Sequence, residues 1–190
     1  MHAPSWPMIT ERLQLRPFEE HDLASLHGMH SDEEVVRWLL NDVRSLEETQ
    51  AILARKIASS ALGGEGDWLS AAVVLQQSGE LVGDVSLHWA SEPYAQGELG
   101  FVFATAHHGN GYATEASRPM LDFAFGALHL HRVVGRLEAR NVGSARVLEK
   151  LGMRREAHFV ENEWVKGEWQ SELVYAILAR EWYDGSTAPG

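Results

Sequence analysis

The stretch that decides the fold is His108-Gly109-Asn110-Gly111-Tyr112-Ala113-Thr114-Glu115-Ala116, which directly follows the apolar segment Leu99-Gly100-Phe101-Val102-Phe103. Two glycines separated by one residue, where a strand meets a helix, leave backbone N–H groups free to point into one space. The positive end of the helix dipole adds to the field there. The sequence therefore predicts an anion site suited to a pyrophosphate, although a plain strand-to-helix turn explains the same glycines.

The residues after this loop have the apolar period of a helix that faces a core. They are Tyr112, Ala113, Ala116, Met120, Phe123, Ala124 and Ala127. Pro119 removes one backbone donor inside that helix, so we expect a kink near Glu115. The loop contains neither G-x-x-x-x-G-K-[ST] nor G-x-G-x-x-G, which excludes the Walker and dinucleotide-binding loops.

A second segment, Asn141-Val142-Gly143-Ser144-Ala145-Arg146-Val147-Leu148-Glu149-Lys150-Leu151-Gly152-Met153, sharpens this interpretation. Together with Glu98-Leu99-Gly100-Phe101 and the glycine loop, it resembles the GNAT N-acetyltransferase superfamily. The opening Ile9-Thr10-Glu11-Arg12-Leu13-Gln14-Leu15-Arg16-Pro17-Phe18 looks like the first strand of the branch that holds the ribosomal-protein N-terminal acetyltransferases. The resemblance covers about residues 8 to 182.

The resemblance implies an α/β fold with a twisted, mostly antiparallel sheet, splayed between two parallel strands and flanked by helices. We expect one such acetyltransferase domain over residues 1–183, followed by a flexible tail over 184–190. The implied activity is acetyl-CoA-dependent N-acetyltransfer to a primary amine by direct attack on the thioester. The acceptor stays open between a protein N-terminus, an aminoglycoside or amino sugar, a polyamine and a small metabolite. A non-catalytic acyl-CoA-binding sensor is the alternative.

In the family, the glycine loop holds the pyrophosphate of coenzyme A, and the residue that opens the loop is Gln or Arg. His108 stands at that position here, which puts its side-chain contact in doubt but keeps the backbone donors. The resemblance implies a coenzyme A site made of Phe101, Val102, Phe103, His108, Gly109, Asn110, Gly111, Tyr112, Ala113, Thr114, Asn141, Ser144 and Arg146.

Two candidate catalytic residues follow. Asn141 and Ser144 lie three apart at the start of one helix and project to the same end of the sheet. In this branch a serine or tyrosine protonates the departing thiolate, and the segment has no tyrosine, which favours Ser144. Glu98 is the preferred base, acting through water, with Glu138 as second choice; a surface carboxylate at a strand end is the plainer explanation of Glu98. Backbone N–H groups near Val102 are expected to stabilise the oxyanion.

Alternation and capping signals predict the other elements. Strands are expected over 8–16, 68–76, 81–90, 98–105, 132–137, 153–165 and 168–178, and helices over 19–30, 32–40, 45–62 and from Asn141 to Gly152. Ser45 and Glu48 form a predicted capping box.

Composition limits the function classes. The chain has 190 residues, no cysteine, and 27 acidic against 16 basic residues, giving a net charge of −11. The absence of cysteine excludes disulfides and a cysteine nucleophile. The acidity argues against a nucleic-acid surface, and suits either a cationic acceptor or plain solubility. The first seven residues lack a basic and apolar leader and no apolar run is long enough for a membrane span, so we expect a cytoplasmic protein.

The remaining candidates have plainer explanations. His107, His108, His129 and His131 lack a spaced ligand set, so we expect no metal. Trp164 and Trp169, with Trp38 and Tyr94, could line an acceptor pocket, and core packing or a homodimer contact explains them equally well.

Overall fold

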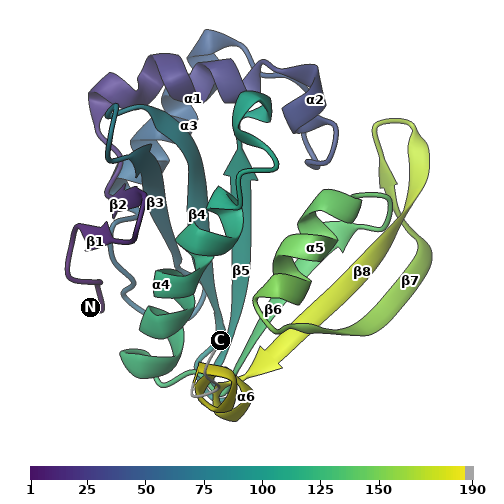
Figure 1. Cartoon of the computed structure of the whole chain (residues 1–190). Coiled ribbons are helices and arrows are strands. Elements are labelled where there is room, and N and C mark those ends of the chain that lie inside the picture. Colours follow the sequence, from purple (N-terminus) through teal and green to yellow (C-terminus); the bar gives the residue numbers. More distant parts are fainter. Residues whose placement is uncertain (187–190) are drawn as a thin grey trace.

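The computed structural model describes residues 1–186 and has one eight-stranded sheet. The strand order is β1-β2-β3-β4-β5-β6-β8-β7, antiparallel throughout except between β5 and β6 (Figure 1). The strands are β1 (Met8–Ile9), β2 (Leu13–Arg16), β3 (Trp68–Leu75), β4 (Leu81–Ser91), β5 (Gln96–Phe103), β6 (Arg132–Glu138), β7 (Arg154–Val165) and β8 (Glu168–Leu178). The mixed sheet confirms the expected α/β fold class.

Helices cover both faces of this sheet. They are η1 (Glu20–Asp22), α1 (Leu23–His30), α2 (Glu33–Val36), α3 (Leu46–Ala58), η2 (Thr105–His107), α4 (Tyr112–Gly126), α5 (Val142–Lys150) and α6 (Ala179–Ser186). Two apolar clusters lie on the two faces of the sheet. One joins α1 and α3 to Ala72 and Val74 of β3, and the other joins α4 to their neighbours Ala71 and Val73. Alternate residues of a strand point to opposite faces, so α1 and α3 lie on one face and α4 on the other.

The parallel pair is splayed as expected. Its register covers only Gln96↔Arg132, Gly97↔Val133 and Glu98↔Val134, although both strands continue beyond these residues. Gly135 on β6 lets α5 approach closely, because a Cβ there would lie 2.7 Å from a methyl group of Leu148. Figure 1 shows the two strands diverging upward with α5 beside the gap. The sheet therefore opens at its centre.

Local signals explain where several elements begin. Ser45 accepts the N–H of Glu48 at 3.2 Å and Glu48 accepts that of Ser45 at 2.8 Å, so the predicted capping box is confirmed at the start of α3. The turn between β7 and β8 falls at Lys166 and Gly167, as predicted. Helix α4 continues through Pro119, and the expected kink near Glu115 stays a prediction.

Some boundaries differ from the sequence expectation. The first strand is interrupted at 10–12, because Thr10 accepts the N–H of Leu13 with its hydroxyl and turns the chain. The helix expected over 32–40 is only the four-residue α2, and α3 ends at Ala58 rather than near Leu62. Helix α6 extends to Ser186, so 184–186 are helical, while 187–190 of the expected tail lie outside the described residues.

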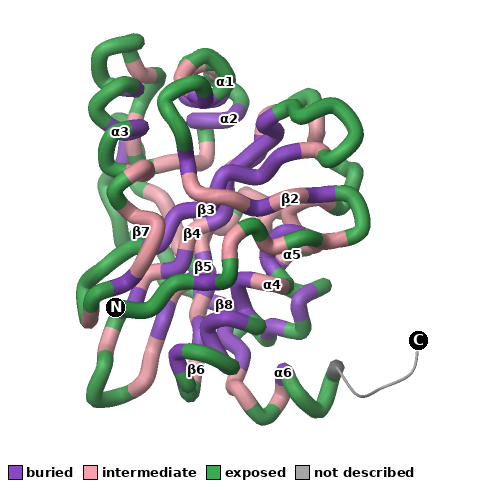
Figure 2. The backbone as a smooth tube through the Cα atoms, turned by 90° about the vertical axis from the view of Figure 1, so that its left-hand side faces the viewer, coloured by how far each residue is buried: buried purple, intermediate pink, exposed green. Residues whose placement is uncertain are grey.

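Burial is concentrated in the central strands. Most residues of β3 and β4 are buried, whereas β7 at the sheet edge is exposed along nearly its whole length (Figure 2). Within residues 1–186, no helix is both long and apolar enough to span a membrane.

Candidate active site

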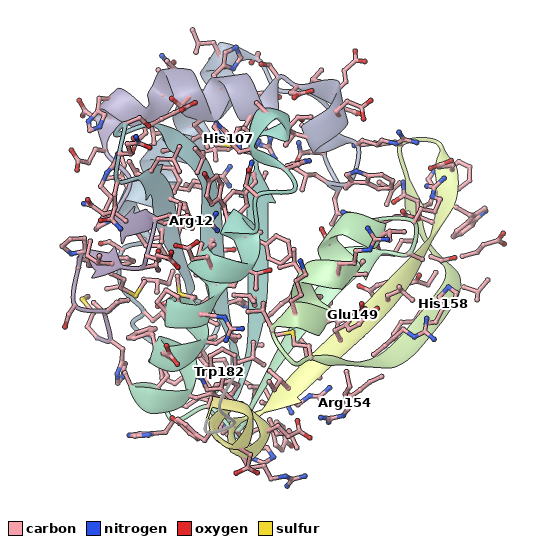
Figure 3. All side chains as sticks on the ribbon, viewed as in Figure 1. Arg12, His107, Glu149, Arg154, His158 and Trp182 are labelled. Carbon is pink, nitrogen blue, oxygen red and sulfur yellow. The ribbon has the colours of Figure 1, made fainter. Side chains whose placement is uncertain are left out.

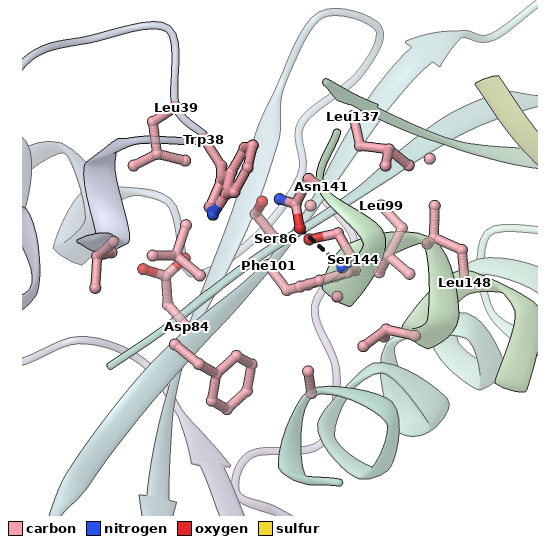
Figure 4. A pocket seen from close by; sticks show the side chains of 18 of the residues that line it. Trp38, Leu39, Asp84, Ser86, Leu99, Phe101, Leu137, Asn141, Ser144 and Leu148 are labelled. Atoms are coloured by element: carbon pink, nitrogen blue, oxygen red, sulfur yellow. Dashed lines mark hydrogen bonds between the residues drawn. The ribbon is translucent and has the colours of Figure 1, made fainter. Parts of the chain in front are cut away.

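A cavity of about 1050 Å³ occupies the gap between β5 and β6. One part of its wall, the cofactor half, comes from β5, the glycine loop, the start of α4, β6 and α5. The other part, the acceptor half, comes from α1, the segment after α2, α3, β3 and β4. Figure 4 shows Trp38 and Leu39 facing Asn141 and Ser144 across this space, with Ser86 and Phe101 between them. The cavity thus connects the two faces of the sheet.

The cofactor half presents an unpaired strand edge. Ala95 accepts backbone N–H groups from His131 and Arg132 on the β6 side, while Ala104 donates to Val82 on the β4 side. Because backbone direction alternates along a strand, Leu99, Phe101 and Phe103 turn their N–H and C=O groups toward the gap. Beyond Glu98, no strand within residues 1–186 pairs with them. The N–H of Val102 itself faces β4, so the expected donor near Val102 belongs to its neighbours.

The glycine loop is preorganised for an anion. Gly109 and Gly111 have φ of +79° and +82°, a region in which glycine is unstrained. A Cβ at Gly109 would meet nothing within 4 Å, so the backbone there is open to a ligand. Gly111 is the N-cap of α4 and has no side chain to occupy the helix N-terminus. These features fit a pyrophosphate.

Two side chains of the loop act on the loop itself. The Nε2 of His108 lies 2.9 Å from the carbonyl oxygen of Phe103, and the side-chain amide of Asn110 donates to the carbonyl of His107 at 3.1 Å. His108 still lines the cavity, whereas Asn110 does not. The contribution expected from Asn110 is therefore that of its backbone position.

Arg12 and Glu115 support this loop through contacts with each other and with Asn110, and no local sequence pattern indicated that they pair. Arg12 forms an ion pair with Glu115 at 2.7 Å and donates to the carbonyl of Asn110 at 3.0 Å. Figure 3 shows Arg12 alongside α4. Burial raises the pKa of Glu115, but hydrogen bonds from Thr10 and Arg12 outweigh it and hold that pKa below the ordinary value.

Asn141 and Ser144 adopt the predicted capping geometry at the start of α5. The side-chain oxygen of Asn141 accepts the N–H of Ser144 at 3.0 Å (Figure 4). Both residues line the cavity, and the hydroxyl of Ser144 has no hydrogen-bond partner among residues 1–186. Further along α5, Arg146 and Lys150 line the same half and form no ion pair with any described residue. They supply positive charge for an anionic ligand.

Glu98 and Glu138 lie outside the cavity wall. Glu98 is half-buried on the sheet face that carries Ser86 and Val102, 3.6 Å from the Nε of Arg136. Burial raises the pKa of Glu98, against the opposing effect of Arg136. Glu138 binds Arg140 at 2.8 Å. Both carboxylates are thus ion-paired, Glu98 at the longer distance, and the role of Glu98 as a base acting through water stays a prediction.

The acceptor half contains polar residues that sequence reasoning missed. Ser70, Ser86 and Gly100 form one cross-strand row, and Ala72, Asp84 and Val102 form the next on the same face. Gly100 makes room for this row, since a Cβ there would lie 2.8 Å from the hydroxyl of Ser86. Asp84 is buried and pairs with Lys56 of α3 at 3.0 Å. The sequence signal that could have identified this half was the presence of polar residues within the alternating patterns of β3 and β4.

The aromatic candidates separate into two groups. Trp38 lines the acceptor half. Trp164 and Trp169 stack edge to face at 5.3 Å on the exposed β7–β8 hairpin, and Tyr94 is exposed, so none of these three lines the cavity. Among the histidines expected not to bind a metal, the Nε2 of His107 lies 3.0 Å from a carboxylate oxygen of Glu80.

The comparisons with known proteins agree with this geometry. The GNAT acetyltransferase domain model matches residues 12–154. The uncharacterized N-acetyltransferase YnaD of Bacillus subtilis is 30% identical over 175 residues, covering 91% of this chain and 97% of YnaD. A GNAT-family acetyltransferase structure from Bacillus anthracis superposes with a TM-score of 0.82 at 30% identity, covering 92% and 99% of the two chains. Spermidine N(1)-acetyltransferase of Vibrio cholerae is 24% identical, covering 94% and 99%.

These matches show the family. The chain belongs to the GNAT acetyltransferases, whose reaction is the transfer of an acetyl group from acetyl-CoA to an amine. The free strand edge, the open glycine loop and the unpaired Arg146 and Lys150 fit the pantetheine arm and phosphates of that substrate.

Proposed function

We propose that this protein acetylates a primary amine by direct attack of the amine on acetyl-CoA, with Ser144 and Glu98 as its acid and base. The observation that carries the proposal is the cavity, which runs from the glycine loop through the β5–β6 gap to a polar pocket on the other face. A carrier that enters from one face and an amine that enters from the other would meet beside Ser144. The proposal uses no covalent enzyme intermediate.

The step balances with the side chains present. Acetyl-CoA supplies the acetyl group as a thioester. A carbon–nitrogen bond forms to the amine, and the carbon–sulfur bond breaks. Glu98 takes a proton of the amine through water, Ser144 gives its hydroxyl proton to the sulfur, and the proton held by Glu98 then passes through water to Ser144. The N–H groups of Phe101 and Phe103 face the gap and would polarise the acetyl carbonyl.

The raised pKa of Glu98 supports its role as base, since a carboxylate with a higher pKa binds a proton more readily. Ser144 is supported by its position in the cavity and by its uncommitted hydroxyl. Because the N–H of Ser144 is held by Asn141, the backbone that carries this hydroxyl is fixed.

The acceptor is an amine, and its class stays open between a protein N-terminus, an aminoglycoside or amino sugar, a polyamine and a small metabolite. The sequence of the opening strand resembles the branch that holds the ribosomal-protein N-terminal acetyltransferases. A structure described as a putative ribosomal-protein-serine acetyltransferase from Vibrio cholerae has the same fold, with a TM-score of 0.75 at 20% identity. We place the protein in the cytoplasm, where acetyl-CoA is available.

We also propose a homodimer through β7. Within residues 1–186, this twelve-residue edge strand leaves one row of backbone groups without a partner strand, and such an edge pairs readily with another copy. Phe159, Val160 and Trp164 expose apolar surface along it. Sedimentation equilibrium at micromolar concentration tests this, and a monomer there contradicts it.

One experiment decides the main proposal. Acetyl-CoA should raise the melting temperature of the protein, and free thiol should be released when a panel of amines is added. A thermal shift without thiol release for any amine would instead identify a non-catalytic acyl-CoA sensor. If acetyl-CoA causes no thermal shift and no thiol is released, the proposal of a coenzyme A site is itself wrong.

A further inference from the structure

The wall of the cavity has the opposite charge balance to the chain as a whole. The protein carries 27 acidic and 16 basic residues, yet Asp84 is the one Asp or Glu in the described wall. That wall holds seven Lys or Arg side chains: Arg44, Arg55, Lys56, Arg136, Arg140, Arg146 and Lys150. The cavity is thus a basic site in an acidic protein.

Ion pairs account for three of these seven basic residues. Lys56 pairs with Asp84, Arg136 with Glu98 and Glu172, and Arg140 with Glu138 and Glu168. The other four form no ion pair with any residue among 1–186. Two of them, Arg146 and Lys150, lie on α5 in the cofactor half, where phosphates are expected. The other two, Arg44 and Arg55, lie in the acceptor half, where acetyl-CoA brings no phosphate.

Arg44 stands beside a second unsatisfied group. Among residues 1–186, the Nε of Arg44 is buried without a hydrogen-bond partner, and so are both ring nitrogens of His30, which is only 7% exposed. The backbone N–H of Arg44 donates to the carbonyl of His30 at 2.9 Å, so the chain itself brings the two residues together. Buried donors without partners are destabilising, and a ligand that accepts from both would relieve this.

The chemistry of the pair favours an anion. Burial lowers the pKa of His30, against the opposing effect of Asp84, so its ring is neutral near pH 7 and offers one N–H donor. The guanidinium of Arg44 can donate to both oxygens of a carboxylate. Val35, Trp38 and Ile52 supply an apolar wall beside them. A polyamine would place several positive charges here, and Asp84 is already paired with Lys56.

We propose that the acceptor is an amino acid, a primary amine that carries a carboxylate, and that Arg44 and His30 bind this carboxylate. The amine end then lies along Ser86, directed toward the gap between β5 and β6. This inference rests on the proposed acetyltransferase function and names its substrate class.

Matched acceptors that differ in one group test the proposal. L-Leucine and L-leucinamide share the amine and the apolar side chain, and the amide lacks the negative charge. We expect kcat/KM for L-leucine to exceed that for L-leucinamide by about 100-fold, from one charge-assisted contact pair. The amide holds more free amine at pH 8, which acts against this preference. Equal values, or a higher kcat/KM for the amide or for spermidine, would overturn the proposal.

Variants then assign the preference to residues. Arg44→Gln should raise the KM for L-leucine by about tenfold or more, leave L-leucinamide unchanged and leave the Kd for coenzyme A unchanged. Arg180→Gln, which removes the same charge from an exposed position outside the cavity, is the control. A weaker Kd for coenzyme A with an unchanged KM for L-leucine would assign Arg44 to a phosphate and refute the proposal. His30→Gln keeps a donor and provides a second variant.

Product binding separates this inference from the acetyltransferase function. Calorimetry with the coenzyme A complex should detect N-acetyl-L-leucine and not N-acetyl-L-leucinamide, independently of turnover. Binding of the acid without turnover of any amine would reject the catalytic function while the carboxylate site stands. Turnover of both acceptors without discrimination, and no selective product binding, would reject the carboxylate site while the function stands.

Discussion

The two halves of the cavity present different chemical groups to their ligands. The cofactor half relies on backbone groups, at the uncovered edge of β5 and at the glycine loop, with Ser144 as its one candidate reacting side chain. The acceptor half relies on side chains that several separate elements contribute, among them His30, Arg44 and Asp84. Backbone recognition tolerates sequence change, whereas recognition by side chains does not. The reaction and the choice of acceptor are therefore set by separate groups of residues.

Ser144→Ala gives the largest expected effect and tests whether the cofactor half contains the acid. Loss of the hydroxyl should lower kcat by about 1,000-fold, because the thiolate then leaves without a proton donor. The Kd for coenzyme A should stay the same, since the backbone contact with Asn141 is retained. Stopped-flow thiol release and calorimetry measure the two quantities. Unchanged turnover would reject Ser144 as the acid, and Ser25→Ala, an exposed serine on α1, is the control.

Glu98→Gln tests the proposed base, which lies on the sheet face of the acceptor half. Burial raises the pKa of Glu98, and a base is lost once it is protonated, so kcat/KM of the wild type should fall as pH drops through this raised pKa. The variant should lose that acidic limb and be slower by about 100-fold at pH 7. Glu172→Gln is the matched control, because Glu172 also contacts Arg136, at 3.1 Å. If Glu172→Gln removes the limb and Glu98→Gln keeps it, the assignment is wrong.

Gly109→Val tests the backbone recognition that defines the cofactor half. At a φ of +79° a β-branched residue is strained, by roughly 1–2 kcal/mol, and its side chain would occupy the open space above the loop. We expect the Kd for coenzyme A to rise about tenfold. Gly79→Val is a matched control, because Gly79 has a φ of +73°, open surroundings and a place in the β3–β4 turn. It should lose similar stability without any change in Kd.

The contrast between the halves also explains what the sequence could predict. The cofactor half lies in two continuous segments, 99–114 and 135–150, whose glycines and cap are local signals. His30, Lys56 and Asp84 are 26 or more positions apart along the chain, and nothing local links them. Burial of a lysine and an aspartate in one cavity is decided by how α3 packs on β4. The opposite error occurred at Trp164, because its place in a hairpin could not show from the sequence that it lies outside the cavity.

The predicted boundaries of one helix were wrong for a related reason. The helix expected over 32–40 had suitable residues, yet only Glu33–Val36 is helical. Trp38 follows in an irregular segment and reaches the cavity, and the carbonyl of Val36 accepts from Lys166 of the β7–β8 turn at 2.6 Å. Tertiary contacts therefore replaced the helix that local propensity favours. The same segment supplies the apolar wall of the acceptor half.

The smallest expected effect concerns Glu115, which supports the cofactor half without contacting it. Its folded-state pKa is lowered, so the stabilisation is complete above the unfolded value of 4.5 and is lost as pH falls through the folded pKa. Glu115→Gln should therefore lower the free energy of unfolding by about 1 kcal/mol at pH 7, a modest value because Arg12 is partly exposed. The difference in the free energy of unfolding between Glu115→Gln and the wild type, measured by urea titration, should become smaller below pH 4.5. Glu11→Gln, an exposed neighbour, should show no such difference. A difference for Glu115→Gln that stays constant down to low pH would mean that the amide disturbs packing, and that Arg12 holds the loop without help from the charge of Glu115.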